Sequence, residues 1–245
     1  TGVQTCALPI YDNDPKLITT MNERIELLRK YGVHHLIIQP FSKEFSRMSA
    51  MEFVRDFLVN KIGTKTLVIG YDHHFGRNRE GSFKDLEEMA GVYNYRLEEI
   101  PKQVIDAAAI SSTKVRTALL NGDIKTANHL LGHDFSLGGK VIDGDKIGRS
   151  LGFPTANISI AENYKLIPKN GIYAVHVKVN GKMYGGMLYI GSRPALHGKR
   201  LSIEVNIFDF DETIYNHDIA VFLKDHIRED MDFKDLERSE EHTSE

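Results

Sequence analysis

The chain has 245 residues, of which 41% are hydrophobic and 27% charged, and its formal net charge is −3. These values are typical of a soluble globular protein with one large or two modest domains, and they give no reason to expect binding to nucleic acid or to a membrane surface. The single cysteine, Cys6, excludes an intrachain disulfide and a cysteine metal cluster. Without a long apolar run or a recognisable signal peptide, we expect a cytoplasmic protein.

Helix signals and apolar runs alternate in the first part of the chain. A capping-box pattern at 20–23 predicts a helix that Gly32 closes. Residues 33–39 read as a strand. A second capping box at 49–52 begins another helix, which we expect to end at Gly63.

Two further strands, at 66–69 and 96–100, lie on either side of a helix predicted near 82–90. Helices that alternate with short apolar strands indicate a parallel sheet, and ligands of such sheets usually bind at the carboxyl ends of the strands. Loops 70–77 and 110–116 are therefore candidate binding loops.

The second of these loops leads into a helix. Ser112 or Thr113 is expected to cap a helix that runs to Leu120, and the amino-terminal N–H groups of a helix attract anions. Lys114 and Arg116 add positive charge near that end. The alternative is that the hydroxyl side chains only cap the helix.

The spacing of apolar residues changes in the second half of the chain. Asp123 is expected to cap a helix through Leu131, and beyond a boundary near His133 the apolar period becomes two residues. Strands are predicted at 136–142, 171–179, 182–190, 201–210 and 218–223. Asn180-Gly181 is a strong hairpin signal between two of them. Five or six short strands with turns between them predict a small barrel.

The stretch 148–157 combines glycines, an arginine and an extended end. If the chain is extended from Pro154 onward, Thr155 and Asn157 point to the same side. A hydroxyl and an amide beside a basic glycine loop could hold a phosphate and its metal ion. The alternative is an ordinary loop, since the same residue types are common in turns.

Alternation in the strand around 201–207 places Ser202, Glu204 and Asn206 on the face opposite its apolar residues. On this pattern alone, Glu204 reads as a solvent-facing glutamate. A functional carboxylate is the alternative.

Three motifs resemble those of flavin-processing enzymes. The run 144–157, Gly-Asp-Lys-x-Gly-Arg-x-Leu-Gly-Phe-Pro-Thr-Ala-Asn, resembles the signature of the riboflavin kinases. Residues 110–116 resemble the Ile-Ser-Ser-Thr-x-x-Arg motif of the nucleotidyltransferase superfamily that includes FMN adenylyltransferase, and 70–76 is similar to its flavin-side loop. Together they resemble the bifunctional prokaryotic riboflavin kinase/FAD synthetase family.

This resemblance implies a fold and an activity. It implies an α/β, Rossmann-like but incomplete FMN adenylyltransferase domain over 11–132, followed by a six-stranded antiparallel riboflavin kinase barrel over 134–236. The implied reaction is ATP-dependent phosphorylation of riboflavin to FMN with Mg²⁺, and in the intact family adenylylation of FMN to FAD. We expect small-molecule partners only, and a monomer or weak homo-oligomer. Another nucleotidyltransferase with an accessory barrel, or a non-catalytic flavin-binding module, remains open.

The resemblance also implies roles for individual residues. Glu204 corresponds to the general base of the kinase, and Thr155 and Asn157 to its metal-binding side chains. The ATP-binding residues of the kinase would be Asp145, Lys146, Gly148, Arg149, Gly152, Phe153 and Pro154. The flavin side of the adenylyltransferase would be Gly70, Asp72, Phe75 and Gly76, and its nucleotide side Ser111, Ser112, Thr113 and Arg116.

The chain departs from the family pattern in places. It contains no Gly-x-Phe-Asp-Gly-x-His-x-Gly-His loop, whose histidines stabilise the transferring phosphate in the family, so we expect this chain to make little or no FAD. Residues 1–10 and 238–245 match nothing in the family pattern, and we interpret them as non-native ends of a chain truncated at its amino terminus. Tyr189 and Ala195 replace an asparagine and a threonine of a flavin-side loop.

Overall fold

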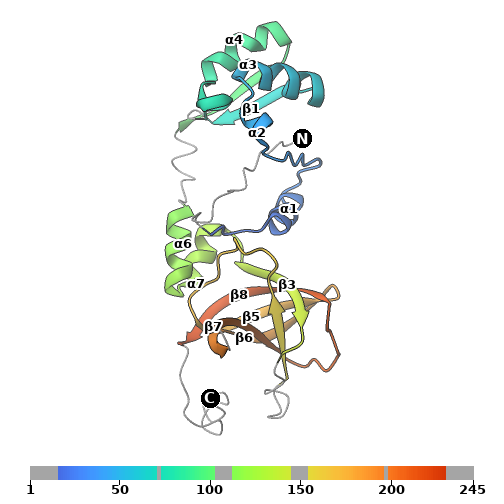
Figure 1. The fold of residues 1–245 in the computed structure, drawn as a ribbon, viewed down its shortest axis with the longest axis vertical. Helices are drawn as coiled ribbons and strands as arrows, with labels where there is room; N and C mark the ends of the chain where they lie inside the picture. The colour runs from blue at the N-terminus through green and yellow to red at the C-terminus, as the bar shows by residue number, and fades with distance from the viewer. Residues whose placement is uncertain (1–15, 71–72, 103–111, 145–153, 196–197, 230–245) are drawn as a thin grey trace. The chain divides into compact units, whose positions relative to one another are not determined.

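The computed structural model describes residues 16–70, 73–102, 112–144, 154–195 and 198–229 (Figure 1). The chain divides into two compact units. The first contains Val33–Ala109 together with Thr1–Asp12, and the second contains Asn13–Gly32 together with Ile110–Glu245. No helix in the described ranges is long and apolar enough to cross a membrane.

The first unit is a small α/β arrangement. Its elements are α2 (Lys43–Ser46), α3 (Ala50–Glu52), the π-helix η1 (Phe53–Ile62), β1 (Thr66–Gly70), the 3-10 turn η2 (Arg77–Arg79), α4 (Phe83–Tyr93) and β2 (Arg96–Ile100). Strands β1 and β2 pair in parallel, with Thr66 opposite Arg96, which confirms the predicted parallel pairing. Ser49 and Ser82 cap α3 and α4 through capping boxes, and Gly63 ends η1 in the left-handed region at φ 75°.

Aromatic side chains form much of the core of this unit. The ring centroids of Phe45 and Phe57 lie 5.3 Å apart, and Phe53 lies 5.6 Å from Phe57 and 5.8 Å from Phe75. These separations are in the range of favourable aromatic pairs. Phe53 and Phe57 of η1 therefore pack into the core of this unit.

One predicted strand is wrong. Residues 33–39 adopt no strand, although their sequence is apolar and β-branched. A strand requires a neighbour to which its N–H and C=O groups can bond. In the described part of this unit the sheet consists of β1 and β2 alone, and 33–39 pairs with neither.

The described part of the second unit contains the helices α1, α6 and α7 and the barrel. Helix α1 (Met21–Lys30) begins at the predicted capping box, in which Thr20 and Glu23 exchange hydrogen bonds. Helix α6 (Ser112–Asn121) is followed by α7 (Ile124–Leu131), which Asp123 caps and Gly132 ends at φ 71°. Figure 1 shows α6 and α7 side by side at one end of the barrel.

Six antiparallel strands close into a barrel, as predicted, and their order around it is β3-β4-β7-β6-β5-β8. They are β3 (Ser136–Ile142), β4 (Thr155–Ser159), β5 (Gly171–Val179), β6 (Lys182–Ala195), β7 (Gly198–Ile207) and β8 (Asp218–Arg228). The β5–β6 hairpin turns at Asn180 and Gly181, whose φ values of 48° and 80° are those of a tight primed turn. The barrel interior is a continuous apolar core to which α6 and α7 contribute Val115, Leu119, Ile124 and Ala127.

A buried ion pair fastens the start of α1 to the barrel. The side chain of Lys165 is 1% exposed, and its Nζ lies 2.5 Å from Glu23 Oε2 and 2.8 Å from the carbonyl oxygen of Ile18. The same ammonium lies 4.4 Å from the centroid of the Phe135 ring. Burial lowers the pKa of Lys165, while the Glu23 carboxylate acts in the opposite direction.

Candidate active site

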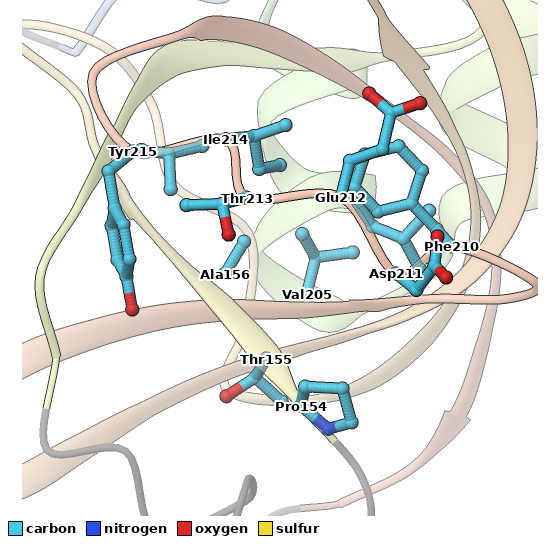
Figure 2. Close-up of a pocket in the computed structure, with 12 residues that line it drawn as sticks. Pro154, Thr155, Ala156, Val205, Phe210, Asp211, Glu212, Thr213, Ile214 and Tyr215 are labelled. Carbon is cyan, nitrogen blue, oxygen red and sulfur yellow. The ribbon is translucent and has the colours of Figure 1, made fainter.

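A cavity of about 360 Å³ opens beside β4 and β7 (Figure 2). One wall consists of Pro154, Thr155 and Ala156 at the start of β4, and the other consists of the segment 210–215, which connects β7 to β8. The floor is apolar, with Val205 from β7 among its residues. A hollow with a polar rim and an apolar floor is the usual form of a small-molecule site.

The connecting segment 208–217 is held in place by its backbone. The N–H of Phe208 donates to the carbonyl of Gly185, and the N–H of Asn216 donates to the carbonyl of Val141. The rings of Tyr184 and Phe210 meet edge to face with centroids 5.1 Å apart. These contacts anchor the segment at both ends, so this wall of the cavity is pre-formed.

Glu204 is the buried carboxylate of this region, at 7% exposure. Thr155 Oγ1 donates to its Oε2 over 3.2 Å, and Ser202 Oγ donates to its Oε1 over 2.6 Å. The interpretation of Glu204 as a solvent-facing residue is therefore wrong. Alternation assigns a strand residue to one face of a sheet, but whether that face is covered depends on the rest of the fold.

Thr155 and Asn157 lie on the same side of β4, as predicted from an extended chain after Pro154. Asn157 is opposite Glu204 in the β4–β7 register, and Thr155 is opposite Asn206. The amide of Asn206 donates to the carbonyl of Pro154 over 2.8 Å, which fixes the entry into β4. The structure thus brings a hydroxyl, an amide and a carboxylate together.

Gly144 makes room for this group. A Cβ at position 144 would lie 2.1 Å from Asn157 Nδ2, closer than two such atoms can approach. Glycine is therefore needed here because the backbone runs directly against the Asn157 amide.

Part of the predicted nucleotide loop is outside the described residues. This applies to Asp145, Lys146, Gly148, Arg149, Gly152 and Phe153, and in the adenylyltransferase half to Asp72 and Ser111. Pro154 is described, and it lines the cavity at the start of β4.

The predicted adenylyltransferase residues that are described belong to different compact units. Gly70 ends β1, Phe75 is buried, and Gly76 has φ 75° beside the backbone of Ala50. In the second unit, the guanidinium Nε of Arg116 donates to the carbonyl of Lys16 over 3.1 Å.

The predicted cap of α6 is displaced. The helix begins at Ser112, so Ser112 and Thr113 lie in its first turn and neither is the N-cap. Local sequence preferences do not resolve a helix boundary to within one residue.

Sequence reasoning did not find the Ser202–Glu204 hydrogen bond or the anchored segment 208–217. The first had a signal, because residues i and i+2 of a strand lie on one face. The second had none, since its partners, Gly185 and Val141, are distant in the sequence.

This half of the chain is thus a closed antiparallel barrel in which a buried carboxylate, a hydroxyl and an amide lie on neighbouring strands. The riboflavin kinase family model matches residues 131–242, and the FAD synthetase family model matches residues 6–114.

Curated relatives carry both activities in their names. The chain is 36% identical over 236 residues to the bifunctional riboflavin kinase/FMN adenylyltransferase of Buchnera aphidicola subsp. Schizaphis graminum, covering 95% of this chain and 75% of the relative. It is 36% identical over 233 residues to the protein of the same name from Bacillus subtilis, covering 92% and 72%. The chain therefore belongs to the bifunctional riboflavin kinase/FMN adenylyltransferase family.

A solved structure has the same fold over nearly the whole chain. It comes from Streptococcus pneumoniae, its title describes a macrolide-efflux protein, and it matches with a TM-score of 0.81 at 28% identity. The match covers 99% of this chain and 80% of that one.

Proposed function

We propose that the barrel phosphorylates riboflavin at the expense of ATP, giving FMN and ADP. Family membership supports the reaction, and the observation that carries it is the buried Glu204 carboxylate, which is held by two hydroxyls, one of them from the cavity-lining Thr155. The kinase half thus supplies the FMN that flavin cofactor biosynthesis needs.

Glu204 is the general base of this proposal. Its carboxylate accepts the proton of the ribityl 5′-hydroxyl as that oxygen forms a bond to the γ-phosphorus and the bond to the β-phosphate oxygen breaks. Phosphoryl transfer needs little covalent chemistry from the protein, so positioning and charge neutralisation carry most of the catalysis. A carboxylate fixed on two sides suits that requirement.

The donor set suits a magnesium ion. Mg²⁺ prefers oxygen ligands and takes only one or two from a protein, with phosphate oxygens and waters as the rest. Thr155 Oγ1 and the Asn157 side-chain oxygen are of this kind, and both lie on one side of β4. Thr155 and Asn157 would hold the ion, which when bound neutralises charge on the ATP phosphates.

The remaining roles are also proposals. The ATP-binding flap is assigned to Asp145, Lys146, Gly148, Arg149, Gly152 and Phe153 together with Pro154. The functional division into 11–132 and 134–236, a cytoplasmic location, and a monomer or weak homo-oligomer remain predictions. In the intact family the first half adenylylates FMN to FAD, and for this chain we expect little or no FAD.

Incubation of the full chain with riboflavin, ATP and Mg²⁺, followed by chromatography of the flavins, tests the proposal. The expected product is FMN, formed only when ATP and Mg²⁺ are both present. Flavin binding without any FMN from a folded chain would favour a non-catalytic flavin-binding module instead.

A further inference from the structure

The two oxygens of the Glu204 carboxylate have different partners. Oε2 accepts from Thr155 Oγ1 over 3.2 Å, and Oε1 accepts from Ser202 Oγ over 2.6 Å. Thr155 lines the cavity and belongs to the proposed metal-binding side, whereas Ser202 does not line it. The carboxylate is therefore held from two directions by residues of different function.

Ser202 reaches Glu204 because of strand geometry. The two residues are two apart on β7, so both side chains leave the same face of the strand. Across β6 the residue opposite Ser202 is Gly191, which has no side chain to compete for the hydroxyl. The Ser202 hydroxyl has one proton to donate, and it donates it to Glu204.

A general base needs a fixed lone pair as well as a charge. A glutamate carboxylate can rotate about its last torsion, which is a broad, two-fold one. With Oε1 bonded to Ser202, that rotation would break a short, charge-assisted hydrogen bond.

We propose that Ser202 is a positioning residue for phosphoryl transfer, fixing the orientation of the Glu204 carboxylate. This inference rests on the proposed riboflavin kinase function. It gives Ser202 no contact with substrate or metal, so removal of the hydroxyl should affect turnover and leave substrate binding unchanged.

The test compares three full-length variants with wild type. Ser202→Ala removes the hydroxyl, Ser202→Thr keeps it, and Ser159→Ala is a matched control, because Ser159 is an exposed serine two residues from Asn157 on β4. For each variant, kcat and KM for FMN formation and the temperature of thermal unfolding are measured.

For Ser202→Ala we expect kcat to fall about tenfold or more, with KM for ATP and riboflavin unchanged. Ser202→Thr should restore most of the rate, and Ser159→Ala should match wild type.

Wild-type turnover in Ser202→Ala would overturn the inference. A lower rate accompanied by a raised KM, a lower unfolding temperature and no rescue by threonine would overturn it too, because that is the behaviour of a purely structural residue. If wild type forms no FMN, or if Glu204→Gln is as active as wild type, the proposed function itself fails. Failure of the Ser202 inference can therefore be distinguished from failure of the proposed kinase function, because only the latter affects wild type or Glu204→Gln.

Discussion

The hydroxyl of Thr155 on β4 donates a hydrogen bond to Oε2 of Glu204 on β7 across 3.2 Å. The strand register places Asn157, two residues along β4, directly opposite Glu204, so the Thr155 bond runs diagonally between the strands. Thr155 also lines the cavity. One side chain thus connects the cavity, the proposed metal-binding pair and the proposed base.

Glu204→Gln should abolish most kinase activity without unfolding the barrel. Glutamine is nearly isosteric, and its one carbonyl oxygen can still accept from one of the two hydroxyls while its NH2 group faces the other, but it cannot take the ribityl proton at neutral pH. We expect kcat for FMN formation to fall by about 10² or more, with ATP affinity largely intact. The measurements are steady-state kinetics and calorimetric ATP binding. Near-normal turnover would remove Glu204 from the role of base.

Thr155→Val should weaken the use of Mg²⁺, because it removes the hydroxyl and keeps the branched shape. Thr155 is exposed, so we expect a stability change within about 0.5 kcal/mol and a fall of about tenfold or more in turnover. A titration of activity against Mg²⁺ should show a higher requirement. Thr155→Ser is the control, and it should retain much of the activity. Equal activity of the valine and serine variants would contradict the proposed role of the hydroxyl.

Gly144→Ala should damage the site and spare the fold. The new methyl would lie 2.1 Å from Asn157 Nδ2, and the amide can turn away at little cost to the barrel. We therefore expect lower kinase activity with nearly unchanged thermal unfolding. Gly138→Ala on β3 is the control, because the nearest atom to its added Cβ is 3.9 Å away. Equal activity of the two variants would show that the space beside Asn157 is not needed.

Glu23→Gln should destabilise the second unit. The change keeps a side chain that can complete the capping box and removes only the charge that faces Lys165. Loss of one partner of a buried pair typically costs about 3 kcal/mol. Glu26→Gln on the same helix is the control, because its ion pair with Arg29 is exposed and should change stability by less than about 1 kcal/mol. Urea unfolding measures both, and equal losses would contradict the account.

The destabilisation of Glu23→Gln should shrink as the pH rises. Burial lowers the pKa of Lys165 in the folded chain, so above that pKa the unfolded chain binds more protons and the free energy of unfolding rises with pH. Without the Glu23 carboxylate the pKa of Lys165 is lower still, so the free energy of unfolding begins to rise at a pH closer to neutral. Urea unfolding at about pH 7 and about pH 9.5 should show the difference from wild type narrowing. In the double variant Glu23→Gln with Lys165→Met, the rise in unfolding free energy between the two pH values that Lys165 causes should be absent. If the rise persists in the double variant, a group other than Lys165 causes it.

Local features of the fold could be predicted because short-range chemistry sets them. The box at Thr20 and Glu23, the stop at Gly63 and the turn at Asn180-Gly181 each depend on residues within four positions of one another. The alternation of β4 and β7 likewise placed Thr155 beside Asn157 and Ser202 beside Glu204 on common faces.

Features that depend on distant partners could not be predicted. Residues 33–39 have the composition of a strand but no neighbouring strand among the described residues with which to pair. The burial of Glu204 depends on the folded barrel around it, and Lys165 meets a partner 142 positions away in the sequence. The residue types of the candidate site could be predicted from the sequence, whereas the burial of Glu204 by surrounding parts of the fold could not.

The formation of FMN by the purified chain tests the central claim most directly. Wild type and Glu204→Gln are incubated with riboflavin and ATP, with and without Mg²⁺, and riboflavin, FMN and FAD are separated by chromatography. The account predicts Mg²⁺-dependent FMN from wild type, little FAD, and almost no FMN from the variant. Absence of FMN from a wild-type chain shown to be folded would contradict it.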